Sequence, residues 1–380
     1  MTRDKFLILA VFAILIGSAV AFRLLGGPRP EPAAEPKLAV RPGEYRGISL
    51  QLNNGDDNHP YEPLIDEIGA TGANTVCLVI HAFQENASSA RIFVDRRRGP
   101  SDERLKAMIR YARSPKSERP NARPALKVVL MPIVLLTNPR ENEWRGTIAP
   151  NDWDVWWRDY ADYITRYAKL AQETGVEVFV IGSELVSTEK HEHAARWRDL
   201  IAKVRAAYSG RLSYSANWDH YRKVEWWDQI DIVGMTTYYD LTGGDPPTVE
   251  RLLAAWEPIR EDILKWRAET CPSHPILFTE VGWPNQATCA QYPWDYYRAR
   301  NRPAPQAQAA CFEAFFRTWA GHPAVAGFLV WEWRGDPSWQ GGAEDPSYIP
   351  WNKPAQKVIE KYYRARPSAD SDARTARDGS

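Results

Sequence analysis

Two glutamates, each at the end of an apolar run, are the residues of this chain best placed to do chemistry. Glu184 ends the run VEVFVIGSE at 176–184, and Glu280 ends the run PILFTE at 275–280. Both runs are typical of strands buried on both faces, and parallel barrels carry their chemistry at the carboxyl ends of such strands. Two carboxylates on separate strands suit the hydrolysis of a glycosidic bond. Either glutamate alone could be a salt-bridging group at the rim, but the pair predicts a catalytic site.

The elements that must position these glutamates alternate between strand-like and helix-like patterns. The expected strands are 45–52, 74–83, 126–136, 176–181, 211–216, 230–236, 276–279 and 326–331. The expected helices are 63–72, 102–113, 152–174, 193–208, 249–268, 305–320 and 354–363. Eight strands in alternation with helices predict an α/β fold, the (β/α)8 TIM barrel, as a single catalytic domain. A doubly wound sheet would need a glycine-rich phosphate loop after its first strand, and 49–55 is not one.

Composition limits the possible partners. Lys+Arg and Asp+Glu both total 48, so nothing favours nucleic acid as a partner. The 17 Trp and 17 Tyr favour a carbohydrate, because flat rings stack on the apolar faces of sugars as well as filling cores. The expected strand ends carry no metal-binding cluster and no G-x-S-x-G nucleophile, so we expect neither metal nor cofactor.

The N-terminus has the pattern of a targeting segment. Arg3 and Lys5 precede an apolar run at 6–16, and Ala19-x-Ala21 fits a signal-peptidase site. The apolar stretch also reaches the lower limit for spanning a bilayer, so a retained membrane tether through 6–25 remains open. We therefore expect an exported monomer that is secreted, periplasmic or anchored to the outer face of the cytoplasmic membrane.

The chain divides into four expected parts. Residues 1–25 are the signal peptide or N-terminal membrane anchor, 26–42 a Pro-rich linker, 43–365 the barrel, and 366–380 a disordered tail. Of the four cysteines, which match no zinc pattern, Cys289 and Cys311 could form a disulfide across a long loop. Glu189 and Glu192 are interpreted as charges at a helix start.

Further polar and aromatic residues follow the expected strands. Gln51, His81, Trp218 and Glu332 belong to this predicted rim. The candidates for substrate binding are Trp144, Arg145, Asn217, Tyr238, Trp283, Trp331 and Trp333. Each tryptophan could instead pack over the barrel core.

Several motifs together resemble glycoside hydrolase family 113, a clan A family of retaining glycosidases whose characterised members are β-mannanases. These motifs are WRGTI at 144–148, IGSEL at 181–185, LSYSANW at 212–218, FTEVGW at 278–283 and WEW at 331–333. The resemblance implies that Glu184 is the acid/base, Glu280 the nucleophile and Tyr238 the residue that orients the nucleophile. It also implies that Asn217 and Trp331 line the sugar site, and that the activity is that of an endo-β-mannanase on a β-linked polysaccharide or oligosaccharide, β-mannan favoured.

The chain departs from the family pattern at two places. Ser183 precedes Glu184 where many clan members have Asn, and 130–133 reads LMPI, without the polar sugar contact expected there. Two alternatives remain, namely a catalytically silent carbohydrate-binding barrel and an exopolysaccharide-modifying enzyme of the cell envelope. The presence of both glutamates favours an enzyme, since a binding protein needs neither.

Overall fold

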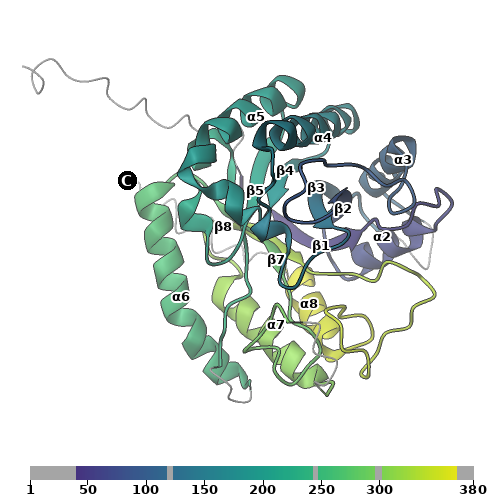
Figure 1. The fold of residues 1–380 in the computed structure, drawn as a ribbon. Coiled ribbons are helices and arrows are strands. Elements are labelled where there is room, and N and C mark those ends of the chain that lie inside the picture. Colours follow the sequence, from purple (N-terminus) through teal and green to yellow (C-terminus); the bar gives the residue numbers. More distant parts are fainter. Residues whose placement is uncertain (1–39, 118–122, 243–246, 296–301, 366–380) are drawn as a thin grey trace, which may run out of the picture. The chain divides into compact units, whose positions relative to one another are not determined.

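The computed structural model describes residues 40–117, 123–242, 247–295 and 302–365. Eight parallel strands form a closed barrel in sequence order, with helices around its outside (Figure 1). The strands are β1 (Tyr45–Gln51), β2 (Thr75–Gln84), β3 (Lys127–Leu136), β4 (Val178–Ser183), β5 (Arg211–Ala216), β6 (Ile232–Thr236), β7 (Ile276–Val281) and β8 (Val325–Val330). The predicted (β/α)8 barrel is therefore confirmed.

The helices follow the predicted pattern. They are α2 (Tyr61–Ala70), α3 (Asp102–Arg113), α4 (Trp153–Thr174), α5 (Ala194–Ala207), α6 (Val249–Thr270), α7 (Pro305–Trp319) and α8 (Pro354–Arg364). No helix was expected after the fifth strand, and there β5 is followed only by the short 3-10 helices η4 (Tyr221–Lys223) and η5 (Trp227–Gln229). Trp226 fills this position instead, with its ring stacked on Trp197 at a centroid distance of 4.7 Å.

Two apolar clusters hold the barrel together. Inward-facing strand residues such as Met131, Val180 and Leu277 form the smaller cluster, inside the barrel. The larger cluster lies between the strands and the helices and contains most of the buried aromatic rings. Most strands contribute residues to both clusters, and in β5 the inward positions are the buried Ser213 and Ser215. The strands are therefore buried on both faces, as a parallel barrel requires.

The ends of α4 set the start of the strand that carries Glu184. The Asp152 side chain accepts hydrogen bonds from the backbone N–H groups of Asp154 and Val155 and so caps the first turn. Gly175 ends the helix with a φ of 69°, a left-handed conformation that glycine adopts without strain. The chain then turns directly into β4.

The predicted targeting segment, the linker up to residue 39 and the C-terminal tail (366–380) lie outside the described residues. None of the helices within the described ranges is long and apolar enough to cross a membrane.

Candidate active site

A cavity of about 1150 Å³ lies among the residues that follow the carboxyl ends of the strands. It brings together both glutamates and five of the predicted substrate-binding residues. The predicted residues that line it are Glu184, Glu280, Trp144, Arg145, Asn217, Tyr238 and Trp331. The cavity exceeds the ~300–1,000 Å³ of ordinary small-molecule sites, which suits a substrate of several sugar rings.

Glu184 occupies an unusual backbone conformation directly after β4. Its φ is 50°, a left-handed value that is uncommon for a residue with a side chain. The Glu184 N–H donates to the Ser215 carbonyl at 2.8 Å, and the next N–H, of Leu185, donates to the Tyr214 hydroxyl at 3.1 Å. These two bonds to β5 hold the strained turn, and the Glu184 side chain lines the cavity.

Glu280 lies within β7 and is 2% exposed. The Tyr238 hydroxyl donates to its Oε2 at 2.9 Å, and the Ser183 hydroxyl donates to its Oε1 at 3.3 Å. Burial and, second, the nearby charge of Glu184 raise the pKa of Glu280 to about 7, although Arg145, Tyr238 and Ser183 each oppose the rise. The structure thus contains the contact between Tyr238 and Glu280 that the family resemblance implied.

One arginine bridges the two carboxylates. Arg145 Nη2 lies 2.5 Å from Glu184 Oε2 and 3.6 Å from Glu280 Oε1. Since a single nitrogen contacts both, these two oxygens are no more than about 6 Å apart, which fits the ~5–5.5 Å of retaining glycosidases better than the ~6.5–9.5 Å of inverting ones. The guanidinium also offsets the repulsion between the two carboxylates.

Two predicted substrate-binding residues do not reach the cavity, so those predictions are wrong. Trp283 is fully buried and packs edge-on against Phe312 behind the rim. Trp333 is 1% exposed and donates its indole N–H to Glu67 Oε2 at 3.1 Å. Both residues lie just past strand ends, but the chain turns them toward the helices.

The interpretation of Glu189 as a charge at a helix start is also wrong. Glu189 is 2% exposed and accepts a hydrogen bond of 2.6 Å from the Tyr214 hydroxyl. Its carboxyl group therefore lies behind the turn that carries Glu184, because Tyr214 also accepts the Leu185 N–H.

The sequence analysis did not indicate eight residues that line the cavity from long loops. Pro139, Glu141, Asn142 and Glu143 come from the loop after β3, Trp294 comes from the loop after β7, and Pro346, Ser347 and Tyr348 come from the loop after β8. The sequence signal for these residues was the length of their loops, which follow the carboxyl ends of strands, where a barrel has its active site.

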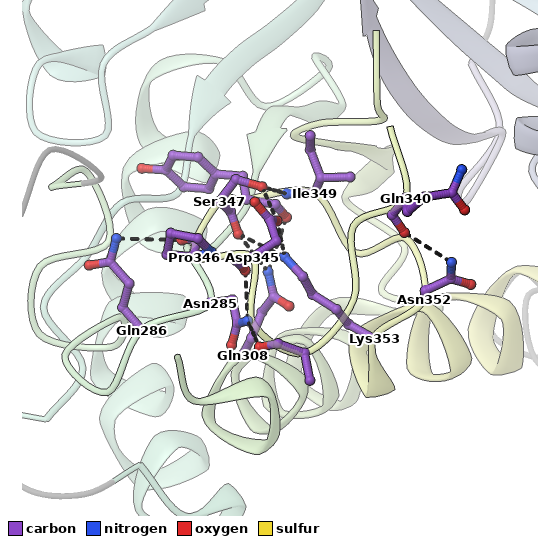
Figure 2. Close-up of polar contacts among 12 residues, drawn as sticks. Asn285, Gln286, Gln308, Gln340, Asp345, Pro346, Ser347, Ile349, Asn352 and Lys353 are labelled. Atoms are coloured by element: carbon purple, nitrogen blue, oxygen red, sulfur yellow. Dashed lines mark hydrogen bonds and ion pairs between the residues drawn. The ribbon is translucent and has the colours of Figure 1, made fainter. Parts of the chain in front are cut away.

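The loop after β8 is held by polar side chains from beneath (Figure 2). Asn285 Nδ2 donates to the carbonyls of Ala343 and Asp345 at 2.8 and 2.7 Å. Lys353, whose side chain is fully buried, pairs with Asp345 at 2.6 Å, and Gln308 donates to the Tyr348 carbonyl at 3.0 Å. This wall of the cavity is therefore fixed by residues of three different segments.

Aromatic rings and apolar side chains form the rest of the lining. The Trp218 and Trp294 rings are nearly parallel, at 15° and 6.1 Å, and Trp294 is 45% exposed. Ile133 and Leu135 of β3 add an apolar surface where a polar sugar contact was expected. Such surfaces can pack against the apolar faces of pyranose rings.

Two carboxylates at this separation, at the ends of β4 and β7 of a closed barrel, place the protein in the class of (β/α)8 glycosidases. The model of Glycoside Hydrolase Family 113 matches residues 59–353, and the chain belongs to this family. The resemblance inferred from the motifs is confirmed.

Solved structures agree with this assignment. The family 113 β-mannanase AaManA from Alicyclobacillus acidocaldarius superposes with a TM-score of 0.72 at 26% identity, over 84% of this chain and 97% of that one. A family 113 β-1,4-mannanase gives a TM-score of 0.71 at 26% identity, over 85% and 100%. A β-glucuronidase from Ruminococcus gnavus, at 13% identity and a TM-score of 0.56 over 85% of this chain and 50% of that one, shares the fold. Among curated proteins none matches the sequence.

Proposed function

We propose that the protein is a retaining endo-β-mannanase-like glycosidase that hydrolyses β-mannan or its oligosaccharides by double displacement. The proposal rests on the positions of Glu184 and Glu280. They lie at the ends of β4 and β7, and both contact the same guanidinium nitrogen of Arg145. The two family 113 structures described above, both of mannanases, support the choice of mannan. The large volume of the cavity, about 1150 Å³, supports an oligomeric substrate.

In the proposed first step, Glu280 attacks the anomeric carbon while the bond to the leaving oxygen breaks. Glu184 donates its proton to that oxygen, and a glycosyl ester forms on Glu280. In the second step a water molecule gives a proton to Glu184 and attacks the same carbon, which releases Glu280. The hydrogen bonds from Tyr238 and Ser183 stabilise Glu280 as a carboxylate.

Arg145 contacts one of the two carboxyl oxygens of Glu184, its Oε2. A guanidinium only donates hydrogen bonds, so we infer that Oε1 carries the proton that Glu184 gives to the leaving oxygen in the first step.

The test combines a polysaccharide panel with two variants. Wild-type protein should cleave β-mannan and give a product of retained anomeric configuration by time-resolved NMR. Glu280→Ala should be inactive on every substrate. Glu184→Ala should still form the glycosyl-enzyme from an aryl glycoside whose leaving group needs no proton, and azide should restore turnover.

Glu344→Gln is the matched control, because Glu344 is exposed on the loop after β8 and does not line the cavity. An inverted product would exclude double displacement. Azide rescue of Glu280→Ala in place of Glu184→Ala would reverse the two roles.

We further propose that the protein is exported as a monomer, with residues 6–25 acting as a cleaved signal or a retained tether. The Arg3, Lys5 and Ala19-x-Ala21 pattern supports this. N-terminal sequencing of the mature protein distinguishes cleavage after Ala21 from an intact N-terminus. A protein found in the cytoplasm with an intact N-terminus would contradict export.

A further inference from the structure

The turn that carries Glu184 rests on two buried side chains that have no part in the proposed double displacement. Tyr214 lies on β5, and Glu189 ends the 3-10 helix η2 (Val186–Glu189), which begins two residues after Glu184. Tyr214 is fully buried and Glu189 is 2% exposed. Neither belongs to the described residues that line the cavity, so any effect of this pair on the reaction must pass through the protein.

The Tyr214 hydroxyl connects the backbone of the turn to the carboxyl group behind it. It accepts the Leu185 N–H at 3.1 Å and donates to Glu189 Oε1 at 2.6 Å. The Leu185 carbonyl in turn accepts from the Thr188 N–H at 2.8 Å and from the Thr188 hydroxyl at 2.7 Å. Both polar backbone groups of the residue next to Glu184 are therefore bonded within one closed ring of contacts.

The Tyr214 ring has little room to move. It packs edge-on against Trp197 and Trp226, at centroid distances of 5.1 and 5.7 Å. It also lies so close to β4 that a Cβ atom on Gly182 would be 3.0 Å from it. The position of the hydroxyl oxygen is thus fixed relative to β4, and Glu189 sets the direction of the O–H bond by accepting it.

The backbone of Glu184 needs this support. Its φ of 50° is a left-handed value, which persists in a residue with a side chain only when the surroundings hold it. The direction of a side chain follows from its backbone, so a relaxed turn would move the Glu184 carboxyl away from the leaving oxygen. A displacement of about 1 Å between reacting groups can cost about 100-fold in rate.

Glu189 accepts this hydrogen bond as an uncharged carboxyl group near neutral pH. Burial and, less strongly, the charges of Glu184 and Asp219 raise its pKa to about 8, although the hydrogen bond from Tyr214 opposes the rise. Since Oε1 accepts from Tyr214, the proton is on Oε2, which is buried without a hydrogen-bond partner among the described residues. A glutamine has the same shape and the same acceptor, whereas an alanine has neither.

We propose that Tyr214 and Glu189 are positioning residues for the acid/base, and that they hold the turn of Glu184 so that its Oε1 faces the leaving oxygen. They act through the backbone of Leu185 and not by contact with the substrate. Proton transfer in both steps therefore depends on them, whereas the attack by Glu280 does not. The inference rests on the proposed function, since that function makes Glu184 the acid/base.

The experiment compares leaving groups that need a proton with leaving groups that do not. The substrates are aryl β-mannobiosides that differ only in the acidity of the phenol released. In Glu189→Ala and in Tyr214→Phe, kcat/KM should fall about 100-fold for unsubstituted phenol and stay within about threefold of wild type for dinitrophenol. On the dinitrophenyl substrate kcat should nevertheless fall, because the second step still needs a base.

Two matched variants separate positioning from general damage to the fold. Glu189→Gln keeps the acceptor for Tyr214 and should restore each rate to within about threefold of wild type. Glu192→Ala, at an exposed site on the same segment, should leave every rate unchanged.

A double variant tests whether the two residues act together. Glu189→Ala combined with Tyr214→Phe should lose no more activity than Tyr214→Phe alone, since both changes break the same connection. Losses that multiply would show two separate effects and contradict the inference. Should Glu189→Ala fail to fold, Tyr214→Phe, which keeps the buried ring, provides the comparison of leaving groups.

Glu184→Ala is the reference that separates this inference from the proposed function. If its losses depend on the leaving group and those of Glu189→Ala and Tyr214→Phe do not, the positioning role is wrong and the proposed function stands. If its losses do not depend on the leaving group, Glu184 is not the acid and both are wrong. If wild type cleaves another aryl β-hexoside in place of the mannoside, the mannan assignment alone is wrong, and the same series on that hexoside tests the positioning role.

Discussion

Arg145 decides how the charge of the two active-site glutamates is shared. It is the cation that contacts both carboxylates, and it lies closer to Glu184 than to Glu280. Without it, Glu280 would keep only the hydrogen bonds from Tyr238 and Ser183 against burial and the charge of Glu184. The ionisation of the proposed nucleophile therefore depends on this one side chain.

Arg145→Met should raise the pKa of Glu280 further above its present value of about 7, since a cation that lowers it is removed. The acidic limb of the pH profile of kcat/KM reports ionisation of the nucleophile, so it should move to higher pH by about one unit or more. Arg145→Lys, which keeps a positive charge, should move it less. An unchanged acidic limb in the Met variant would contradict this role.

Glu189 supports the turn of Glu184 as an uncharged carboxyl group. Burial raises the pKa of Glu189 to about 8, and Tyr214 links it to the Leu185 N–H. Its folded-state pKa thus exceeds the ordinary glutamate value of about 4.3. The stability that its proton provides is complete below that value and is lost as the pH rises toward 8.

Glu189→Gln should therefore flatten the decline of the unfolding free energy between pH 5 and 8. The difference in slope should be at most about 1.4 kcal/mol per pH unit, because the variant has no proton to lose there. Urea denaturation at several pH values measures it, and Glu192→Gln, at an exposed site, is the control. Parallel curves for Glu189→Gln and wild type would show that Glu189 is not the titrating group.

At the scale of elements, the connection from β7 to α7 contributes a residue to the lining of the cavity and a cysteine that lies next to a second cysteine on α7. Trp294 lies in this connection. Cys289 precedes it and Cys311 is on α7, and the two free thiols are buried with their Sγ atoms 3.8 Å apart. The sequence suggested that this pair could form a disulfide, and the structure places the two sulfurs in contact.

Oxidised glutathione should convert the pair into a disulfide. The two thiols lose two protons and two electrons, and the glutathione disulfide takes them up and becomes two molecules of reduced glutathione. The reaction should be slow, because burial raises the pKa of Cys311 well above its ordinary value. The oxidised protein should gain about 2–4 kcal/mol in unfolding free energy. Mass spectrometry of peptides detects the bond, Cys311→Ser should abolish the gain, and Cys77→Ser should not. Equal stability of the oxidised and reduced proteins would contradict the prediction.

The positions at which the strands end were predictable from the sequence, whereas the paths of the loops were not. Gly175 and the apolar run after it fix β4, so Glu184 had to stand at the rim. The loop after β8 takes its path from Asn285, Gln308 and Lys353, which are distant from one another in the sequence (Figure 2). No local pattern could indicate that Ser347 and Tyr348 would face the cavity.

At the scale of the whole molecule, residues 43–365 should fold alone as one barrel. The strands close on themselves through the pairing of β1 with β8, so the two ends of the domain depend on each other. Limited proteolysis of the full chain should leave a single resistant core of this length. Two resistant fragments of comparable mass, separable without denaturant, would refute a single domain.

The sequence by itself predicted the barrel, and it named both glutamates and five of the seven proposed substrate-binding residues that the structure places at the cavity. Alternating strand and helix periodicity fixes where each strand ends, and parallel strands end at the same rim. That is why Asn217, Tyr238 and Trp331 were found from their positions alone.

Only the tertiary structure decided what happens beyond the strand ends. It turned Trp283 and Trp333 away from the cavity and brought Trp294 into it. It also stacked Trp226 on Trp197 in the segment after β5 and set Arg145 between the glutamates. The physical reason is that a strand's period is local to the chain, whereas the direction of a loop is set by the distant groups that satisfy its hydrogen bonds and cover its apolar side chains.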